Sequence, residues 1–532
     1  MRKLFLCAFA AAACSRGARK DVTPPLAAEA PAAAAQQAGL ADAPALTQPE
    51  MVEHLLARLT FGPRQRDRAR VQEIGLAGFI EEQLHPEQLD DSALDQRLAS
   101  YDVLHQGADT LVQQLVAERK LRQRRPGRDS VAQLAQAKLL RAVLSRRQLE
   151  EELVDFWFNH FNVFAGKDQE PALLPDYQER VLRPNALATF PELLEATAHS
   201  PAMLVYLDNW RSAAPGPARP PRRWERFIQN VQNAEPPRKP KRGLNENYAR
   251  ELLELHTLGV DGGYTQQDIV EVARCFTGWT VEQPRRDPRF VFRPAMHDFG
   301  EKRVLGQVIP AGGGEEDGAQ VLRLLAAHPS TARFVARKLS RRFVSDTPPE
   351  SLVLKVAGAY TRTHGDVRSM LRAIFESPEF WSRKELKAKV RSPLELVAAA
   401  VRGLEATVSD PGALARAVAR IGEPLYGAQP PTGYPDLAQT WLSSGALLAR
   451  IDFGLQLANG QVEGVTVDLS RLAAEKPEAL VQKAADELGA TALSDQTRAY
   501  ILDQLQKAPP KPALQAARAV GLLLGAPELQ RR

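Results

Sequence analysis

Apolar residues recur at three- and four-residue spacings along almost the whole chain after residue 50, and this periodicity constrains the fold more than any other feature. A segment with such spacing presents one apolar stripe when it is helical. In Glu50–Leu59, for example, the stripe contains Val52, Leu55 and Leu59. Comparable segments follow at Val71–Leu84, Thr110–Leu121, Val131–Leu144, Gln148–Phe164, Pro191–His199, Gly318–Ala327, Thr331–Phe343, Leu352–Thr363, Val367–Phe375, Pro393–Leu404, Gly412–Ile421, Trp441–Leu457 and Leu469–Leu524. The sequence therefore predicts a mainly α, multi-helix globular domain over residues 50–532.

One stretch, Arg289–Ile309, favours strands instead of helices. It contains the short apolar runs Phe290–Phe292 and Val304–Ile309, which are rich in aromatic and β-branched residues. Such runs are typical of strands. We expect the two runs to pair with each other, giving a small β-hairpin near residues 290–309.

The first twenty residues have the features of an export signal. Arg2 and Lys3 precede the short apolar run Leu4–Ala13, which small residues follow. This order is typical of a secretory signal peptide, and the run is too short to span a bilayer as a stable helix. Residues 1–20 are therefore predicted to be a signal peptide, and the protein is predicted to leave the cytoplasm. Residues 21–49 are rich in Ala, Pro and Gln, which predicts a disordered tether.

Two processing routes fit the end of the signal peptide. The run from Ala11 to Cys14 resembles a bacterial lipoprotein box, although leucine is usual where Ala11 stands. In that route Cys14 becomes the lipidated N-terminus and attaches an outer-membrane or cell-surface lipoprotein to its membrane. In the other route ordinary cleavage occurs near Ala13 and the protein is released into the periplasm.

The charge balance gives little reason to expect a nucleic-acid ligand. The chain of 532 residues has 69 Lys and Arg against 64 Asp and Glu, a net charge of +5. Much of this excess lies in Pro215–Arg242, where arginines and lysines alternate with prolines, so we interpret that stretch as an exposed basic loop. No specific nucleic-acid binding is expected. Cys275 is the one cysteine outside the leader, so no disulfide framework is expected either.

Asn245–Trp279 contains an unusual histidine and an unusual glutamate. Drawn as a regular helix, its first half places His256 at the edge of a leucine stripe and Glu251 on the other flank, also beside leucines. The ladder formed by Glu246, Arg250 and Glu254 is explained by i, i+4 ion pairs, each worth about 0.2–0.5 kcal/mol. The ladder does not explain His256 or Glu251. These two side chains point far apart round such a helix, so we do not expect them to bind one small ion together.

A second helical histidine and a loop pair complete the candidate site. His160 lies near the centre of the apolar face of Gln148–Phe164, while Glu151, Asp155 and Asn162 lie opposite. A buried imidazole needs a hydrogen-bond partner, because an unsatisfied polar group costs about 1–3 kcal/mol. His297 and Asp298 are adjacent in the loop beside the predicted hairpin.

Together these residues suggest one hypothesis and one alternative. His160, Glu251, His256, His297 and Asp298 are suitable as ligands for a divalent metal such as zinc or iron, or as a general acid–base set. No tight metal-binding spacing of the HExxH kind is present to support the metal version. The alternative is that the histidines are separate core residues, each with its own hydrogen bonds.

Several stretches of the chain resemble one widespread bacterial family, described only as domain of unknown function number 1800. The resemblance extends over nearly the whole chain after the tether, and Pro215–Arg242 looks like an insertion relative to a typical member. It rests on Asn245–Trp279 together with Glu53–Leu56, Thr60–Gly62, Trp157–Phe164, Met203–Asp208, the residues around His297-Asp298 and Leu305-Gly306, Lys389–Glu395, Trp441-Leu442 and Gly525–Glu528. The resemblance implies a largely helical, exported protein. Because no activity is assigned to members, it assigns no catalytic residue.

Two function classes follow from these observations. The first is an exported cell-envelope enzyme with a cleft near the candidate residues and hydrolytic or metal-assisted chemistry. The second is a non-catalytic envelope protein that binds a partner protein or a polymer through its helical surface. The sequence does not decide between enzyme and binding protein. The two are distinguished by whether His160, His256 and His297 reach one pocket in the folded chain.

Overall fold

A computed structural model of the protein describes residues 45–122, 125–214, 243–472, 474, 476–490, 493–509 and 511–532. The predicted signal peptide, Cys14, most of the predicted tether and the basic loop at 215–242 lie outside the described residues. The described part from Ala45 to Arg532 is one compact unit. It is mainly α with short antiparallel strand pairs, which confirms the predicted fold class.

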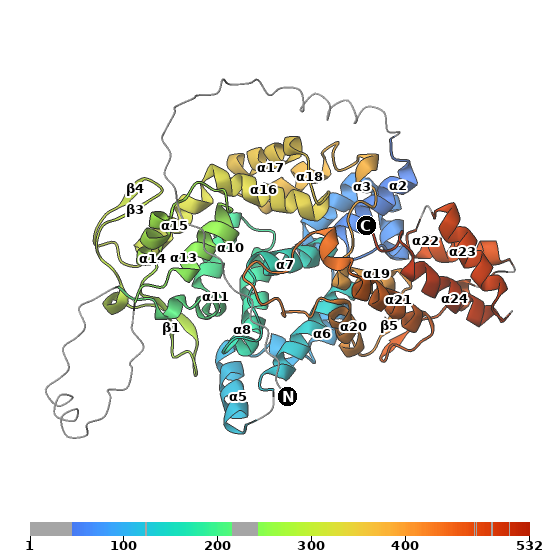
Figure 1. Ribbon diagram of the computed structural model, residues 1–532, viewed down its shortest axis with the longest axis horizontal. Helices are drawn as coiled ribbons and strands as arrows, with labels where there is room; N and C mark the ends of the chain where they lie inside the picture. The colour runs from blue at the N-terminus through green and yellow to red at the C-terminus, as the bar shows by residue number, and fades with distance from the viewer. Residues whose placement is uncertain are drawn as a thin grey trace, which may run out of the picture. The chain divides into compact units, whose positions relative to one another are not determined.

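Helices follow one another along nearly the whole described part of the chain (Figure 1). The first half contains α2 (Gln48–Leu59), α3 (Gln65–Leu84), α4 (Ser92–Leu98), α5 (Ala108–Lys120), α6 (Arg128–Leu144), α7 (Gln148–His160), α8 (Glu170–Asp176), α9 (Arg183–Asn185), α10 (Phe190–His199), α11 (Pro201–Tyr206), α13 (Asn247–Glu251) and α14 (Gln266–Cys275). The second half contains α15 (Glu316–Ala326), α16 (Pro329–Phe343), α17 (Glu350–Arg362), α18 (Val367–Phe375), α19 (Pro393–Gly403), α20 (Gly412–Ile421), α21 (Ser444–Ala458), α22 (Pro477–Glu487), α23 (Asp495–Gln506) and α24 (Pro512–Gly525).

Helix α7 lies in the middle of this arrangement. In Figure 1 it has the α16–α18 group above it and α6 below it, and it packs directly against α2, α3 and α6. The apolar core divides into two clusters. One extends from α2 to α18, and the other joins α6 and α19 to the helices from α20 to α24. Helix α6 contributes to both clusters, so α6 connects them, whereas the buried apolar residues of α7 belong to the first cluster.

Local sequence signals explain where many helices begin. Thr47 accepts a hydrogen bond from the backbone N–H of Glu50, whose carboxylate accepts one from the backbone of Thr47 in return. This capping box starts α2 at Gln48, two residues before the predicted boundary at Glu50. Ser392 and Glu395 form the same box at the start of α19.

The predicted strands exist, but the predicted pairing between them is wrong. Strand β1 (Trp279–Glu282) pairs with β2 (Arg289–Phe292), whereas β3 (Lys302–Val304) pairs with β4 (Gln307–Ile309). A third short pair joins β5 (Thr407–Val408) to β6 (Val465–Thr466). Leu305 and Gly306 both have positive φ between β3 and β4, as a tight two-residue hairpin turn requires. This turn splits the run Val304–Ile309 into two strands, so β2 is left to pair with β1.

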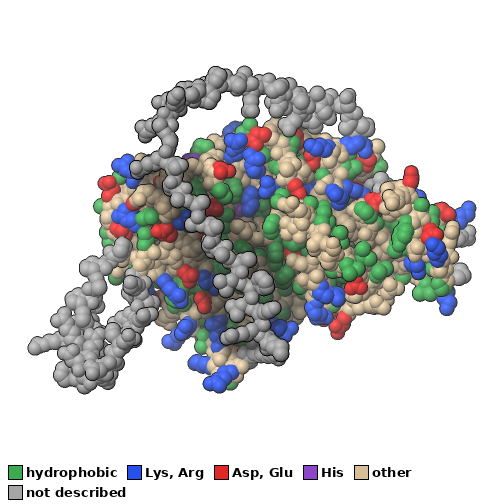
Figure 2. Space-filling model, viewed as in Figure 1, with side chains coloured by type: hydrophobic (Ala, Val, Ile, Leu, Met, Phe, Trp, Pro, Cys, Tyr) green, Lys and Arg blue, Asp and Glu red, His purple; other side chains and the backbone are tan. Residues whose placement is uncertain are grey.

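The surface carries charges of both signs. On the face drawn in Figure 2, Lys and Arg side chains lie in small groups among acidic, apolar and neutral surface. Within the described ranges, no helix is both long enough and apolar enough to cross a lipid bilayer.

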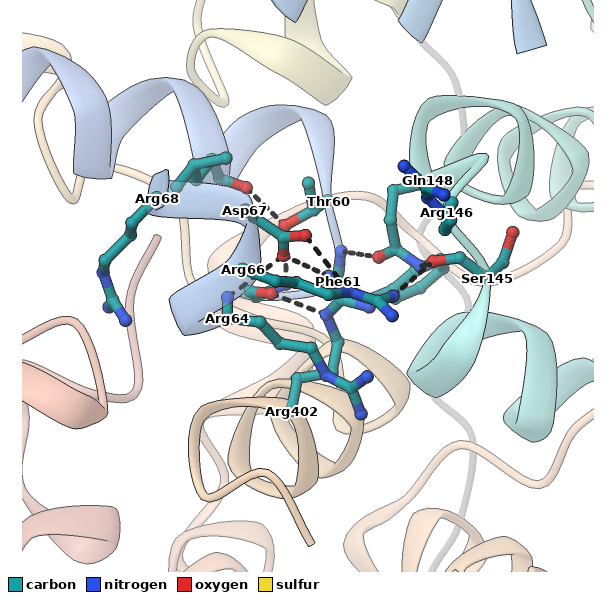
Figure 3. A network of polar contacts seen from close by, with 12 residues as sticks. Thr60, Phe61, Arg64, Arg66, Asp67, Arg68, Ser145, Arg146, Gln148 and Arg402 are labelled. Carbon is teal, nitrogen blue, oxygen red and sulfur yellow. Dashed lines mark hydrogen bonds and ion pairs between the residues drawn. The ribbon is translucent and has the colours of Figure 1, made fainter. Parts of the chain in front are cut away.

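A buried arginine joins the turn between α2 and α3 to two other helices (Figure 3). Arg402, on α19, donates to the carbonyl oxygen of Gly62 at 2.6 Å, to that of Val143 at 2.9 Å and to the carboxylate of Asp67 at 2.8 Å. The side chain of Arg402 has no exposed surface. At Gly62, φ is 133° and an added Cβ would lie 2.6 Å from the Cα of Ala399. Glycine is therefore needed for α19 to approach this turn.

Replacing Arg402 by methionine should destabilise the protein strongly, because it removes a fully buried cation and the hydrogen bonds that this cation donates to Asp67 and two carbonyl groups. Removal of one partner from a buried pair costs about 3–5 kcal/mol. Arg416→Met, which removes an exposed arginine of α20 paired with Glu463, is the matched control, and its effect should be within about 0.5 kcal/mol. Urea denaturation measures both free energies of unfolding. Equal effects for the two variants would contradict the structural role of Arg402.

Candidate functional site

A cavity of about 220 Å³ lies where α6, α7, α16 and α19 meet the irregular segment between α20 and α21. Its walls contain polar and charged side chains alongside aromatic rings. The charged and histidine side chains in its lining are Lys138, Asp155, His160, Lys338, Arg341, Arg342, Glu395, Glu423 and Asp436. The number of ionisable groups around one small space sets this cavity apart from an ordinary packing defect.

Arg342, on α16, connects three carboxylates at the base of the cavity. Its Nη2 lies 2.6 Å from Glu152 and 3.3 Å from Asp155, both on α7, and 3.2 Å from Glu395 on α19. Glu152 has no exposed surface and Glu395 is 3% exposed. Burying this many charges is tolerated only when each has a partner of opposite sign. Arg342 therefore fixes the positions of α7, α16 and α19 relative to one another.

Further cations complete the neutralisation of these carboxylates. Arg532 lies 2.8 Å from Glu395 and 3.3 Å from Glu152, and Lys138 lies 2.6 Å from Asp155. Burial alone would raise the pKa of Glu395, but Arg532 and Arg342 hold that pKa below its ordinary value. Burial raises the pKa of Glu152 even with Arg342 and Arg532 beside it. Asp155 and Glu395, by contrast, have lowered pKa values and are held as anions by their ion pairs.

Asp436 is held in the same way at the edge of the cavity. Lys389 bridges Asp346 and Asp436 at 2.8 and 3.1 Å. Burial opposes ionisation of Asp436, yet Lys389 and Arg342 lower its pKa to about 2. Asp436 therefore stays charged across the physiological range.

Glu423 and Lys338 differ from these paired groups. Burial raises the pKa of Glu423 to about 7, and the charge of Asp155 adds to the shift. Its Oε2 accepts a hydrogen bond from the backbone N–H of Leu394 at 2.8 Å. Burial lowers the pKa of Lys338 to about 8, opposed by Asp436. Among the described residues, neither side chain has a partner of opposite charge within 4.0 Å. The cavity therefore contains one acid and one base that change charge near neutral pH.

His160 lines the same cavity and is held as a neutral ring. Its Nε2 donates to the backbone carbonyl oxygen of His256 at 3.1 Å, so the proton lies on Nε2. Burial among aromatic rings lowers the pKa of His160 well below its ordinary value. Its Nδ1 is buried and has no hydrogen-bond partner among the described residues.

His256 lies beside His160 but not in the cavity lining. The two ring centroids are 6.3 Å apart. The segment Leu252–Thr257 is a π-helical turn that follows α13, so the regular helix predicted for this stretch is wrong at its second half. Burial lowers the pKa of His256 to about 3, which keeps it neutral.

The charged residues of this segment also differ from the prediction. Only half of the predicted ion-pair ladder forms, because Arg250 pairs with Glu246 at 3.4 Å while Glu254 accepts a hydrogen bond from Tyr264 instead. Glu251 is partly buried, and burial raises its pKa. Glu251 is not part of the cavity lining.

The loop pair His297 and Asp298 belongs to a different network. His297 donates through Nδ1 to the carbonyl oxygen of Thr277 at 2.7 Å, and its Nε2 lies 3.1 Å from Asp317. Lys302 pairs with the same carboxylate. Asp298 forms an ion pair with Arg274 at 2.8 Å. In the part of the chain that the structure describes, no hydrogen bond or ion pair connects this network with the cavity, so the structure brings His160 and His256 together without His297. Only His160 lines the cavity, so the three histidines do not reach one pocket, and this outcome disfavours an enzyme built on them.

The chain matches a family model described as a protein of unknown function (DUF1800) over residues 54–531. The chain belongs to this family. Three of the stretches on which the sequence resemblance rested contribute side chains to the cavity: Trp157–Phe164, Lys389–Glu395 and Trp441-Leu442. A fourth, Thr60–Gly62, forms the turn that Arg402 holds. No curated protein and no solved structure matches the chain.

The structure shows no cluster of three or more His, Cys, Asp or Glu side chains suited to a metal ion, counting only the residues that it describes. Cys275 is fully buried, and burial raises the pKa of its thiol to about 12. This environment is typical of a small buried hydrophobe.

Sequence reasoning missed Lys338, Arg342 and Glu423 as site residues. In the sequence Lys338 and Arg342 belong to a run of basic residues on one helix, which is usually a solvated face. Lys338 and Arg342 are four residues apart, which places both on one face of α16, and this spacing was the one sequence feature that could have indicated a shared site. Asp155 and Asn162, which were expected opposite the apolar face of Gln148–Phe164, both line the cavity.

Glu423→Gln should change how stability depends on pH. The pKa of Glu423 is about 7 in the folded protein against 4.5 as its ordinary value, so the folded state favours the proton. The stabilisation from this proton is fully present below pH 4.5 and is lost as the pH rises through 7. Relative to the parent, the variant should therefore gain on the order of 3 kcal/mol between pH 5 and pH 8.

Urea denaturation at several pH values checks this shift. Glu376→Gln, which changes an exposed glutamate at the end of α18, is the matched control and should follow the parent at every pH. A constant difference between Glu423→Gln and the parent across this range would show that Glu423 ionises normally.

Proposed function

We propose that the protein is an exported cell-envelope enzyme that performs hydrolytic acid–base chemistry in the cavity lined by Lys338 and Glu423. One observation carries the proposal: the pKa of Glu423 is raised to about 7 and that of Lys338 is lowered to about 8, while the carboxylates around them are neutralised by ion pairs. Catalytic acids and bases need pKa values near the working pH. A cluster with only a structural role needs no such unpaired groups.

The charge states near neutral pH assign the roles. Between the two pKa values Glu423 is a carboxylate and Lys338 is an ammonium group. The carboxylate takes a proton from a water molecule, whose oxygen forms the new bond to the electrophilic carbon of the substrate. The bond to the leaving group breaks, and the leaving group takes a proton from the ammonium. Glu423 then returns its proton to the Lys338 amine through solvent, which restores both groups.

The size and polarity of the cavity limit the substrate. A volume of about 220 Å³ is smaller than that of most sites for drug-sized ligands, so it accepts one small polar group or the end of a longer molecule. The side-chain amides of Asn159 and Asn162 donate hydrogen bonds to backbone carbonyl oxygens of the irregular segment between α20 and α21, at 2.7 and 2.9 Å. That segment forms one wall, so its position decides the shape of the site.

Lys338→Met and Glu423→Gln should each reduce turnover by about 10²-fold or more without unfolding the protein. Lys355→Met, at an exposed position on α17, and Glu376→Gln are matched controls that should keep full activity. The assay is a screen of the mature protein against esters and cell-envelope polymers, with circular dichroism to verify folding. Folded cavity variants that turn over a substrate as fast as the parent would contradict the proposal.

Elemental analysis of the purified, active protein tests the metal-assisted version of this chemistry. An active preparation that contains no metal would exclude it.

Export and membrane attachment are part of the proposal and are supported by the leader pattern. If Cys14 is lipidated, the parent should incorporate a labelled fatty acid in a bacterial host and sediment with membranes. Cys14→Ser should abolish the label and release the protein, whereas Cys275→Ser should leave the label unchanged. A parent protein that is exported without any label would support ordinary cleavage near Ala13 instead.

The alternative is a non-catalytic envelope protein that binds a partner protein or a polymer through its helical surface. The observation that favours it is an exposed apolar stripe on α21, where Leu448, Ile451 and Leu455 are 69, 40 and 37% exposed. A stripe of this kind is more common at binding surfaces than on monomers. Complete inactivity of the parent in the screen, together with a normal pKa for Lys338, would favour this alternative.

A further inference from the structure

Two cations of α16 line the cavity of Lys338 and Glu423 without an anionic partner. Lys338 and Arg341 are three residues apart, so they are neighbours on one face of the helix. The Nε of Arg341 donates to the carbonyl oxygen of Asp346 at 3.0 Å, and its two terminal nitrogens have no hydrogen-bond partner among the described residues. In the same part of the chain neither side chain forms an ion pair. The charge of Arg341 also helps to lower the pKa of Lys338, as expected of two neighbouring cations.

These nitrogens keep contact with solvent, so a ligand in the cavity can reach them. Lys338 and Arg341 are both partly exposed, whereas Arg342 beside them is buried. The Nε of Arg342 is closed to solvent, but Lys338 Nζ and the terminal nitrogens of Arg341 are not. The Nε1 of Trp441, in the same lining, is also open and has no acceptor among the described residues. The cavity thus offers two cations and one neutral donor to a ligand.

The charges of the lining select a ligand with a single negative charge. Most of its charged groups are paired with one another or with neighbours outside the cavity: Lys138, Asp155, Arg342, Glu395 and Asp436. The charged groups without an opposite charge within 4.0 Å, among the described residues, are Lys338, Arg341 and Glu423. Near neutral pH these three carry two positive charges and one negative charge. A carboxylate supplies the missing charge and matches the fork of a guanidinium group, whereas a phosphate ester near its second ionisation supplies more.

The position of Arg341 shows which part of the substrate carries the carboxylate. In the proposed hydrolysis Lys338 gives its proton to the leaving group, and Arg341 is its neighbour on α16. Glu423, which activates the water, comes from the segment that follows α20. The carboxylate therefore belongs to the leaving group. A positioned acid matters most for an amide, because the nitrogen must gain a proton before it leaves.

We propose that the substrate is a small N-acyl amino acid, or the last residue of a peptide, whose free carboxylate binds Arg341 and Trp441 Nε1. This assignment rests on the proposed hydrolytic function. The water gives a proton to Glu423 while its oxygen bonds to the acyl carbon. The bond from that carbon to nitrogen breaks, and the nitrogen takes a proton from Lys338.

Isothermal titration calorimetry on the mature chain tests the carboxylate site with three probes: N-acetylalanine, its neutral amide N-acetylalaninamide, and inorganic phosphate. N-acetylalanine should bind about tenfold more tightly than either of the others, because it alone has both the single charge and the acyl group. Equal binding of the neutral amide would overturn the proposal. Phosphate binding as tight as that of N-acetylalanine would show a general anion site and would overturn it as well.

The titration of Lys338 supplies a second readout that needs no cavity variant beyond the one used for assignment. An anion bound beside an ammonium group favours its charged form. Saturating N-acetylalanine should therefore raise the NMR midpoint of Lys338, and N-acetylalaninamide should leave it unchanged. A midpoint that N-acetylalanine does not move would place the carboxylate elsewhere and contradict the proposal.

Arg341→Gln assigns the preference for an acid to one side chain. The variant should bind N-acetylalanine about tenfold more weakly and N-acetylalaninamide as the parent does. Arg337→Gln removes an exposed arginine of the same helix that pairs with Glu350 at 2.7 Å, and this matched control should keep the preference. An Arg341→Gln protein that is folded by circular dichroism and still prefers the acid would overturn the proposal.

Binding and turnover together separate this inference from the proposed function. Carboxylate-dependent binding without release of acetate would support the carboxylate site and contradict the hydrolytic function. Release of acetate from N-acetylalaninamide as fast as from N-acetylalanine would support the hydrolytic function and overturn the carboxylate site.

Discussion

The buried guanidinium of Arg342 is the contact on which the centre of the molecule depends. It joins α16 to Glu152 and Asp155 on α7 and to Glu395 on α19. Helices α7 and α16 belong to one apolar cluster and α19 belongs to the other. Ions buried in this way are costly unless the geometry of the pairs is good. Apolar packing alone would allow these helices to slide or rotate. The directional bonds of one guanidinium to several carboxylates define a single arrangement.

The same ion pairs explain why the cavity beside them has unusual chemistry. The pairs neutralise the carboxylates of Asp155, Glu395 and Asp436, so these groups are no longer available to neutralise Lys338 or to take a proton. For Lys338 and Glu423 the effect of burial is then only partly compensated, by the charge of Asp436 and by the Leu394 N–H respectively, and their pKa values move toward each other. The ion pairs of Arg342 that hold the helices together therefore also leave Lys338 and Glu423 without partners of opposite charge.

The helical fold could be predicted from the sequence because its signal is local. The apolar stripe of Glu50–Leu59 and the capping residue Thr47 are encoded within one or two turns of α2. The strand pairing failed because it depended on the turn at Leu305-Gly306, whose positive φ values divide one apolar run into two strands. The prediction for Leu252–Thr257 assumed a regular α-helix. This segment forms a π-helical turn instead, so its side chains do not follow α-helical spacing.

The candidate site was predicted in part, and the missing part has a physical reason. His160 could be found because a histidine on an apolar face is visible in the sequence. Its neighbour His256 was found for the same reason. Lys338 and Glu423 could not be found, since only tertiary packing brings a lysine of a basic helix and a glutamate of an irregular segment to one cavity. His297 was grouped with the other histidines by residue type, but its partners Thr277, Asp317 and Lys302 hold it in a network of its own.

The chemistry of the cavity depends on a lysine, Lys338, that has no ion-pair partner among the described residues. An NMR titration of protein labelled with ¹³C at the lysine side chains measures its pKa, with the Lys338 signal assigned by its loss in a Lys338→Met sample. The midpoint for Lys338 should lie near pH 8, well below the ordinary lysine pKa of 10.5. A midpoint at or above the ordinary value would show that Lys338 is solvated or paired and does not lose its proton near neutral pH.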